Sequence, residues 1–424
     1  MAKMKSLHAL EILDSRGRPT LKTTCTLYSG SSGSASVPSG RSTGTAEALE
    51  LRDKDPARYR GMGCKKAVAN VNSAINNHFA GQRISTQQEL DAQLCELDGT
   101  DNKRKLGANA ILSVSVAFAR AQAQELGIPL YQAFANMIKR QASTFPRLTI
   151  NLFSGGKHAG KQVAIQDVLV VPSAPDSIEE SLILMSDVYH AAADIIHGRY
   201  GMRLLTADEG GLAPPFEDTE TMLQTAVEAI SNGGYVPGQD AHLALDVAAS
   251  HFYSNGSYQI DGAHYSSSQM IELFIHWCDT YPIVSIEDGL FEDDWQNWPA
   301  LQSALGHRIL VLGDDFLCTN PDRIKRAIDQ KACNALLLKV NQIGTLSEAA
   351  QSYLLAKEAG WMVTISVRSG ETEDDWAADL ALGWSGDQFK NGSIMQSERL
   401  AKYNRLLEIE SQTPFPLVNW PNRA

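Results

Sequence analysis

Four apolar runs in the second half of the chain each end in one ionisable residue, and this pattern restricts the fold strongly. The runs at 243–245, 283–286, 309–313 and 335–338 lead into Asp246, Glu287, Asp314 and Lys339, respectively. Each run has the length of a buried strand, and the intervening segments can hold a returning helix, as in parallel βα units. In a closed β/α barrel, residues at the carboxyl ends of the strands meet on one face. Three carboxylates and a lysine there predict a metal-assisted enzyme with a base beside a hard metal ion.

Helix starts between these runs are also marked. Asn320 precedes Pro321 and Asp322, which predicts a helix that begins with a capping side chain and a proline in its first turn. Thr345 and Glu348 have the spacing of a capping box. Capping or solvated acids are the alternative explanation for the strand-end carboxylates, but three in consecutive units favour a site.

The length of 424 residues allows two domains, one of them a complete barrel. Residues 20–28 alternate as a strand does, and residues 109–126 predict an apolar helix that ends at Gly127. We expect an α/β protein with a small N-terminal α+β cap domain at 1–138 and a β/α barrel at 147–424. A polar linker would join them.

Charge and cysteine content limit the partners. The net charge of −12 disfavours nucleic acid and anionic membranes, so an anionic substrate needs local cations or a metal. No apolar stretch approaches the roughly 20 residues that span a bilayer, and the N-terminus lacks the apolar core of a signal peptide. The six cysteines show no CxxC spacing. We expect a cytoplasmic protein with reduced cysteines.

Two glycine-rich loops carry groups suited to chemistry. The segment 37–44 is rich in glycine and hydroxyls, and predicts either a plain surface loop or a mobile lid in which Ser42 reaches a metal. His158 lies in a glycine-flanked loop directly after an expected strand. A lone histidine is more often structural than catalytic, so His158 is a candidate only in combination with other groups.

Two further segments follow expected strands. Asp208 and Glu209 come after the apolar residues 204–206, at another expected strand end. Arg368 and Ser369 precede a glycine and offer a guanidinium, a hydroxyl and backbone N–H groups. These donors suit a phosphate or a phosphonate.

The chain resembles the enolase family from end to end. The matching segments are DSRG at 14–17, SGRSTG at 39–44, GANAIL at 107–112, DEGG at 208–211, SIED at 285–288, LKVNQIGT at 338–345, RSGETED at 368–374 and SERLAK at 397–402. The resemblance implies an enolase-type β/α barrel behind the cap domain, two Mg²⁺ ions in the site, and a homodimer or a higher homo-oligomer. Fold by itself does not decide the reaction.

The resemblance also implies roles for the metal and proton-transfer residues. Asp246, Glu287 and Asp314 would hold the first Mg²⁺, and Ser42 would help to hold the second. Lys339 would remove the proton α to the substrate carboxylate, which requires a neutral amine that burial and metal charge are expected to provide. Lys390 would help to neutralise the aci-carboxylate dianion.

The remaining roles concern phosphate and the leaving group. Arg368 and Ser369 would bind phosphate, and Glu209 would be the acid at the leaving hydroxyl, with His158 nearby. Enolases have a histidine where this chain has Val367, and a glutamate where it has Asp167. Loss of one charge-assisted hydrogen bond to a leaving group costs a rate factor of ~10²–10³, so both changes argue against efficient 2-phosphoglycerate dehydration.

A third departure is Arg41, which stands in the lid where enolases usually have alanine. We interpret the chain as a diverged paralogue of the carboxyphosphonoenolpyruvate synthase type, which makes an enol ester in phosphonate natural-product biosynthesis. Arg41 would meet an additional anionic group, and Val367 would make room for it. The alternatives are a phosphopyruvate hydratase of glycolysis and a non-enzymatic protein that keeps the fold. Intact acids and lysines at the strand ends oppose the last of these.

Overall fold

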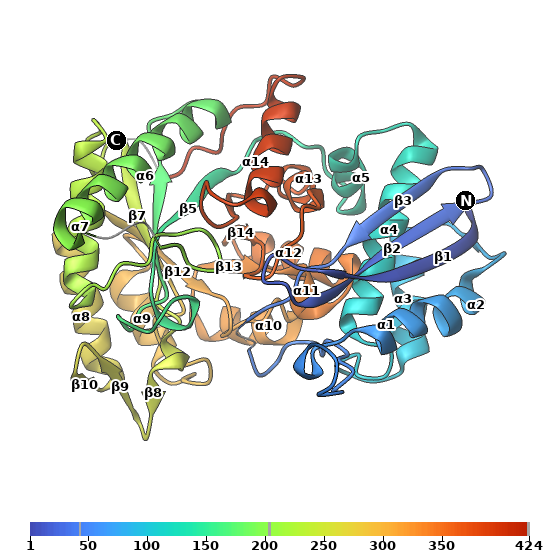
Figure 1. The fold of residues 1–424 in the computed structure, drawn as a ribbon, viewed down its shortest axis with the longest axis horizontal. Helices are drawn as coiled ribbons and strands as arrows, with labels where there is room; N and C mark the ends of the chain where they lie inside the picture. The colour runs from blue at the N-terminus through green and yellow to red at the C-terminus, as the bar shows by residue number, and fades with distance from the viewer. Residues whose placement is uncertain (42–43, 202–204, 422–424) are drawn as a thin grey trace.

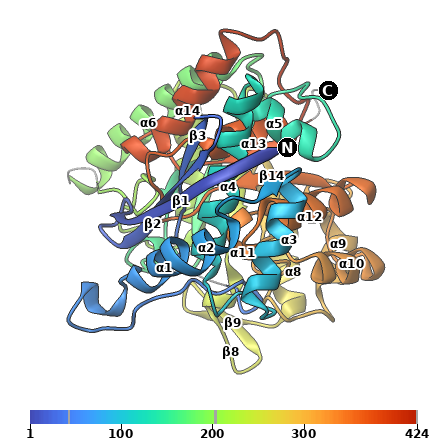
Figure 2. The same ribbon diagram turned by 90° about the vertical axis from the view of Figure 1, so that its right-hand side faces the viewer.

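The computed structural model describes residues 1–41, 44–201 and 205–421, and consists of a small sheet with helices followed by a closed barrel. The elements of the N-terminal part are β1 (Ala2–Leu13), β2 (Pro19–Leu27), β3 (Ser32–Ser36), α1 (Lys65–Asn70), α2 (Asn76–Phe79), β4 (Arg83–Ile84), α3 (Gln87–Asp98), α4 (Ala108–Leu126) and α5 (Leu130–Met137). Figure 1 shows its strands in blue beside the barrel, and Figure 2 shows them with helices α1–α3 toward the viewer.

The N-terminal sheet has the strand order β3-β2-β1-β4, and its long hairpin of β1 and β2 turns at residues 14–18. Gly17 in this turn has a φ of +68°, a conformation that residues with a Cβ rarely adopt. The predicted strand at 20–28 corresponds to β2. Strand β1 was not predicted, although its buried residues Met4, Leu7 and Ala9 are interspersed with polar ones.

Helix α4 confirms the apolar helix predicted at 109–126, and Gly127 follows it in the left-handed conformation. The helix is buried on nearly all sides because it lies between strands β2 and β3 and the barrel. It therefore ties the N-terminal sheet to the barrel through one continuous core.

The barrel is closed by eight strands. In order around the barrel they are β5 (Arg147–Ser154), β6 (Asp167–Pro172), β7 (Ala241–Asp246), β11 (Ile283–Glu287), β12 (Leu310–Gly313), β13 (Ala335–Leu338), β14 (Met362–Ser366) and β15 (Gln388–Lys390). The four apolar runs form β7, β11, β12 and β13, which pair in parallel as predicted. Strand β6 differs, because it runs antiparallel to both of its neighbours. Residues 155–166, which hold only the short 3-10 helix Gly156–His158, join it to β5, and an antiparallel neighbour needs no crossover helix.

Helices cover the outside of the barrel. They are α6 (Ile178–Tyr200), α7 (Thr219–Asn232), α8 (Ser267–Thr280), α9 (Trp298–Leu305), α10 (Pro321–Gln330), α11 (Val340–Ile343), α12 (Leu346–Glu358), α13 (Trp376–Gly383) and α14 (Ser397–Glu410). Asn320 caps α10 and Thr345 caps α12, as the sequence predicts. A small antiparallel sheet of β8 (Tyr253–Ser254), β9 (Ser257–Ile260) and β10 (Ala263–Tyr265) projects from the barrel (Figure 1). Among the described helices, none combines the length and apolar character needed to cross a bilayer.

The N-terminal part reaches over the mouth of the barrel. Ser39, after β3, forms an isolated antiparallel bridge with Gly370, after β14. In the β1–β2 turn, the backbone N–H of Ser15 donates to the carbonyl of Glu371 at 2.7 Å. Residues far apart in the sequence are thus brought to the carboxyl ends of the barrel strands.

Candidate active site

The strand ends bring the predicted acids and lysines to one mouth of the barrel. Asp246 and Glu287 are the last residues of β7 and β11 and are register partners. Asp314 and Lys339 directly follow β12 and β13, and Lys390 ends β15. The four residues other than Lys339 are buried, and the Lys339 side chain is only 13% exposed. Parallel strand packing therefore concentrates ionisable groups in a largely water-free site.

Lys390 joins two of these acids. Its Nζ lies 2.7 Å from Asp246 Oδ2 and 2.7 Å from Glu287 Oε2. Burial opposes ionisation of Asp246, but Lys390 outweighs it and lowers the pKa of Asp246 to about 2. Burial and the charge of Asp246 raise the pKa of Glu287 well above its ordinary value. Two carboxylates that converge on one cationic point offer the oxygen donors that Mg²⁺ prefers, so this donor set fits the ion.

Lys339 pairs instead with Asp314, whose other carboxylate oxygen accepts a hydrogen bond of 2.8 Å from Gln342 Nε2. Burial alone would lower the pKa of Lys339, as the sequence led us to expect. The adjacent Asp314 more than offsets burial, and the pKa of Lys339 is raised. The carboxylate of Asp314 therefore favours the protonated, cationic form of Lys339.

Asp288 is an acid of this region that the sequence analysis did not assign to the site. Its carboxylate accepts the backbone N–H groups of Asp314 and Asp315 at 2.9 and 2.7 Å. The three aspartates have carboxylate oxygens within 4.8 Å of one another. Burial and the neighbouring acids raise the pKa of Asp288 well above its ordinary value and that of Asp315 to about 8. Such a buried group of carboxyl oxygens could hold a divalent cation.

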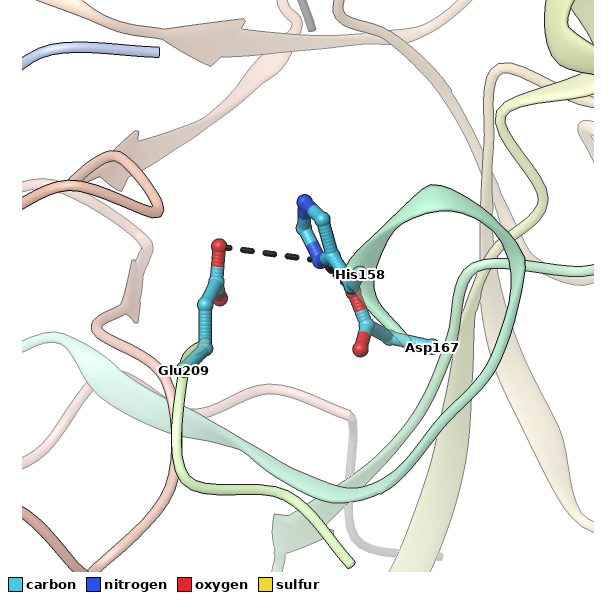
Figure 3. Close-up of side chains that lie close together, drawn as sticks. All are labelled: His158, Asp167 and Glu209. Atoms are coloured by element: carbon cyan, nitrogen blue, oxygen red, sulfur yellow. Dashed lines mark hydrogen bonds and ion pairs between the residues drawn. The ribbon is translucent and has the colours of Figure 1, made fainter. Parts of the chain in front are cut away.

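A second compact group at the mouth is formed by His158, Asp167 and Glu209 (Figure 3), and Asp167 is the register partner of Asp246 on the neighbouring strand. His158 Nδ1 lies 3.0 Å from Asp167 Oδ2 and 3.8 Å from Glu209 Oε1. Burial disfavours the charged imidazole, but the two carboxylates outweigh it and raise the pKa of His158. Burial raises the pKa of Asp167. This group can hold and move a proton.

Glu209 itself is suited to remain ionised. Burial would raise its pKa, but the charges of His158, Arg399 and the two site lysines lower it. Asn151 Nδ2 donates to Glu209 Oε2 at 3.2 Å, which helps to fix the carboxylate. Within this group His158, rather than Glu209, carries the more available proton.

The Arg368 guanidinium and its partners form a third group at the mouth. Both of its terminal nitrogens donate to the carboxylate of Glu47, at 3.0 and 3.1 Å, and one also donates to Asn341 Oδ1 at 3.0 Å. Arg399 holds this segment in place by donating to the backbone carbonyls of Arg368 and Ser369. Glu47 was not predicted, because the only feature of the sequence that points to it is its position just after the predicted lid.

A narrow cavity of about 20 Å³ lies where these three groups of residues meet. The predicted residues that line it are His158, Glu209, Asp246, Lys339, Lys390, Arg41, Val367, Arg368 and Ser369. Asp167, Glu287 and Asp314 do not line this cavity and lie one contact behind its lining residues. The prediction for Ser42 lies outside the described residues. Gln166, which lines the cavity and donates to Asp246 Oδ2 at 3.0 Å, was not predicted.

One local expectation, a strand at 204–206 before Asp208 and Glu209, lies partly outside the described residues. Its described part contributes only an isolated bridge between Thr206 and Leu212. Asp208 and Glu209 lie in a turn in which Gly210 has a φ of +85°. The turn, rather than a strand end, directs Glu209 into the cavity.

Comparison with known families agrees with this architecture along most of the chain. Residues 4–134 match the enolase N-terminal domain, and residues 142–414 match the enolase C-terminal TIM barrel domain. The chain belongs to the enolase family. It is therefore an enzyme of the enolase superfamily. The enolase family uses Mg²⁺ and acts on small anionic phosphate substrates.

Proposed function

We propose that this enolase-family protein abstracts the α-proton of a 2-phosphoglycerate-like acid, in the presence of Mg²⁺, to form an enol ester. Support comes above all from one arrangement: the buried Lys390 and the largely buried Lys339, each paired with carboxylates at strand ends, line the same cavity as Arg368 and Ser369. A base, a cation that can stabilise the negative charge formed on the substrate, and donors for a phosphate are thus available to one small molecule.

In this proposal Lys339 takes the proton from the carbon next to the substrate carboxylate. Asp246, Glu287, Asp314 and Ser42 are the proposed Mg²⁺ ligands. Bound Mg²⁺ supplies Lewis-acid stabilisation of the dianion that proton removal creates. Lys390 contributes a further positive charge. When Asp314 binds a cation, the Asp314 carboxylate no longer stabilises the protonated form of Lys339. Arg368 and Ser369 orient the phosphate group.

The other half of the reaction is loss of the group at C3, which needs a proton donor. His158 has a raised pKa and contacts Asp167 and Glu209, so the proposed donor is the His158–Glu209 pair. Val367 lines the cavity beside Arg368 and offers no hydrogen bond. We infer that this apolar position makes room for a larger substrate.

Arg41 supports a diverged reaction of the carboxyphosphonoenolpyruvate synthase type in phosphonate biosynthesis. It adds a guanidinium to the cavity, and its backbone N–H donates to Ser369 Oγ at 3.0 Å, beside the proposed phosphate donors. A second anionic group on the substrate would be attracted there. A second candidate, phosphopyruvate hydratase, is favoured by the presence of Glu209 and His158 in the same cavity.

The deciding experiment incubates the protein with 2-phosphoglycerate and Mg²⁺ in D₂O and follows phosphoenolpyruvate by ultraviolet absorbance and phosphorus NMR. We expect deuterium at C2 without appreciable phosphoenolpyruvate. A Lys339→Met variant is the control and should lose the exchange. Turnover at ~1–10³ s⁻¹ would favour the hydratase, and absence of both signals would overturn the proposal.

A further inference from the structure

A second polar cavity, of about 420 Å³, lies beside the catalytic one. Its lining includes Arg16, Arg18, Arg41 and Asp208, and we call it the arginine cavity. Arg41 lines both cavities, so the two are adjacent. Three guanidinium groups around one opening are unusual in a chain with a net charge of −12, and they favour an anionic ligand.

The β1–β2 turn is built to present two of these arginines. The buried Asp14 carboxylate accepts the backbone N–H groups of Arg16 and Arg18 at 2.8 and 2.9 Å, and Gly17 permits the tight turn. The Arg16 guanidinium is fixed, because it pairs with Asp14 at 3.0 Å and donates to Ser369 Oγ at 3.1 Å. The turn thus connects the arginine cavity to the proposed phosphate donor Ser369.

Arg18 and Arg41 are the more available cations. Among the residues that the structure describes, the Arg18 guanidinium makes no hydrogen bond or ion pair. Arg41 Nη1 pairs with Asp208 Oδ2 at 2.8 Å, and both side chains are partly exposed, so an anion could compete with Asp208 for Arg41. Burial lowers the pKa of Arg16, and the charge of Arg18 lowers it further, which shows that the guanidinium groups are close enough to repel each other.

We propose that the arginine cavity binds the phosphorus oxyanion of a second substrate, delivered through Arg41 to the catalytic cavity. The proposal rests on the proposed function, because only a reaction of the synthase type requires a second anionic substrate. Planar guanidinium groups match the geometry of phosphonate and phosphate oxygens better than ammonium groups do. The ligand is therefore a small phosphonate or the phosphate of a nucleotide leaving group.

Isothermal titration of the full-length protein with phosphonoformate tests this, with Mg²⁺ and saturating 2-phosphoglycerate present to fill the catalytic cavity. We expect Arg18→Gln to weaken binding about tenfold, the effect of losing one hydrogen bond to a charged group. Asp208→Asn should tighten binding severalfold, because it removes the competing carboxylate. The exposed Arg83, on β4, supplies the control Arg83→Gln, which should bind as the unmodified protein does.

Equal affinities of the unmodified protein and Arg18→Gln would overturn the arginine cavity as a subsite. A nucleoside 5′-monophosphate that binds more tightly than phosphonoformate, and still depends on Arg18, would assign the cavity to a nucleotide phosphate. Arg18→Lys keeps the charge but not the planar fork, so intermediate affinity is expected. Thermal unfolding of each variant checks that it remains folded.

Deuterium exchange at C2 of 2-phosphoglycerate, measured on the same unmodified sample, separates the two proposals. Exchange without Arg18-dependent binding would reject the subsite and leave the proposed function standing. Arg18-dependent binding without exchange would support the subsite and reject the proposed proton abstraction.

Discussion

In the proposed reaction, single side chains distinguish proton abstraction from loss of the leaving group. Lys339 and Lys390 are held by carboxylates at strand ends, whereas His158 and Glu209 are the groups proposed for the leaving-group side. Val367, buried next to Arg368, presents only methyl groups to the cavity. The proposed base Lys339 has its charged partners in place, whereas the leaving-group side has the apolar Val367. This difference is the main reason to treat proton abstraction and dehydration separately.

Substitution Val367→His should increase formation of phosphoenolpyruvate from 2-phosphoglycerate about tenfold or more, because it adds a charged donor at the leaving-group side. Steady-state absorbance assays would measure the increase. Val367→Ala is the matched control for altered size and should give no increase. Equal gains in the two variants would mean that space, rather than a proton donor, limits dehydration.

At the scale of elements, the barrel shows where local pattern is sufficient. Strands β7, β11, β12 and β13 follow from short apolar runs, and the caps of α10 and α12 follow from side chains next to each helix start. Strand β15 has only three residues, and the apolar residues of β6 do not reveal that it runs antiparallel to its neighbours. Barrel closure therefore depends on strand pairs that the local sequence does not reveal.

The cap of α10 gives a prediction about stability. Asn320 Oδ1 accepts the backbone N–H groups of Asp322 and Arg323, which would otherwise lack partners within the helix. Asn320→Ala should lower the free energy of unfolding by about 1 kcal/mol, as measured by urea denaturation. Asn320→Asp keeps the acceptor and should lose far less. A similar loss in both variants would assign the effect to something other than the cap.

At the scale of the whole molecule, the N-terminal part completes the site at the barrel mouth. Glu47 binds Arg368, and the β1–β2 turn brings Arg16 to Ser369. The predicted division into domains at 1–138 and 147–424, the homo-oligomer and the cytoplasmic location stay predictions. Asp91 of α3 and Ser347 of α12 form a further contact between the N-terminal part and the barrel.

One of these contacts is pH-dependent. Asp91 of α3 is buried and accepts the backbone N–H and the hydroxyl of Ser347 of α12, at 2.9 and 2.6 Å. Burial raises the pKa of Asp91 from 3.8 to about 6. The folded state then binds the proton more tightly than the unfolded state does. The contribution of Asp91 to stability is therefore largest below about pH 4 and falls as the pH rises to about 6.

The variant Asp91→Asn is neutral at every pH and removes this dependence. We expect the stability of the unmodified protein relative to Asp91→Asn to fall by on the order of 3 kcal/mol between pH 4 and pH 7. Urea unfolding at several pH values would measure the difference in free energy of unfolding between the two proteins. The contributions of all other titrating groups cancel in this difference. Parallel pH profiles for the two proteins would contradict the raised pKa.

The second whole-molecule prediction concerns Mg²⁺, which should bind the folded protein and not the unfolded chain. At one hundred times its dissociation constant it should add about 2.7 kcal/mol to the free energy of unfolding. Thermal unfolding with Mg²⁺ or with a chelator measures this. Asp246→Asn and Glu287→Gln should each reduce the increment, whereas Asp101→Asn, at an exposed acid, should keep it. An increment unchanged by the first two variants would place the ion elsewhere.

Matching segments along the sequence were enough to indicate the family and, by comparison with it, the departures at Arg41 and Val367. The barrel strands that lead into Asp246, Glu287 and Lys339 followed from local apolar runs, which depend only on neighbours along the chain. The tertiary structure decided which groups meet: Lys390 with Asp246, Glu47 with Arg368, and the arginines of the β1–β2 turn with Arg41. It also decided the charge of Lys339, whose raised pKa depends on Asp314. Such contacts join residues distant in the chain, and electrostatic interactions depend on separation in space and on burial, which no local pattern contains.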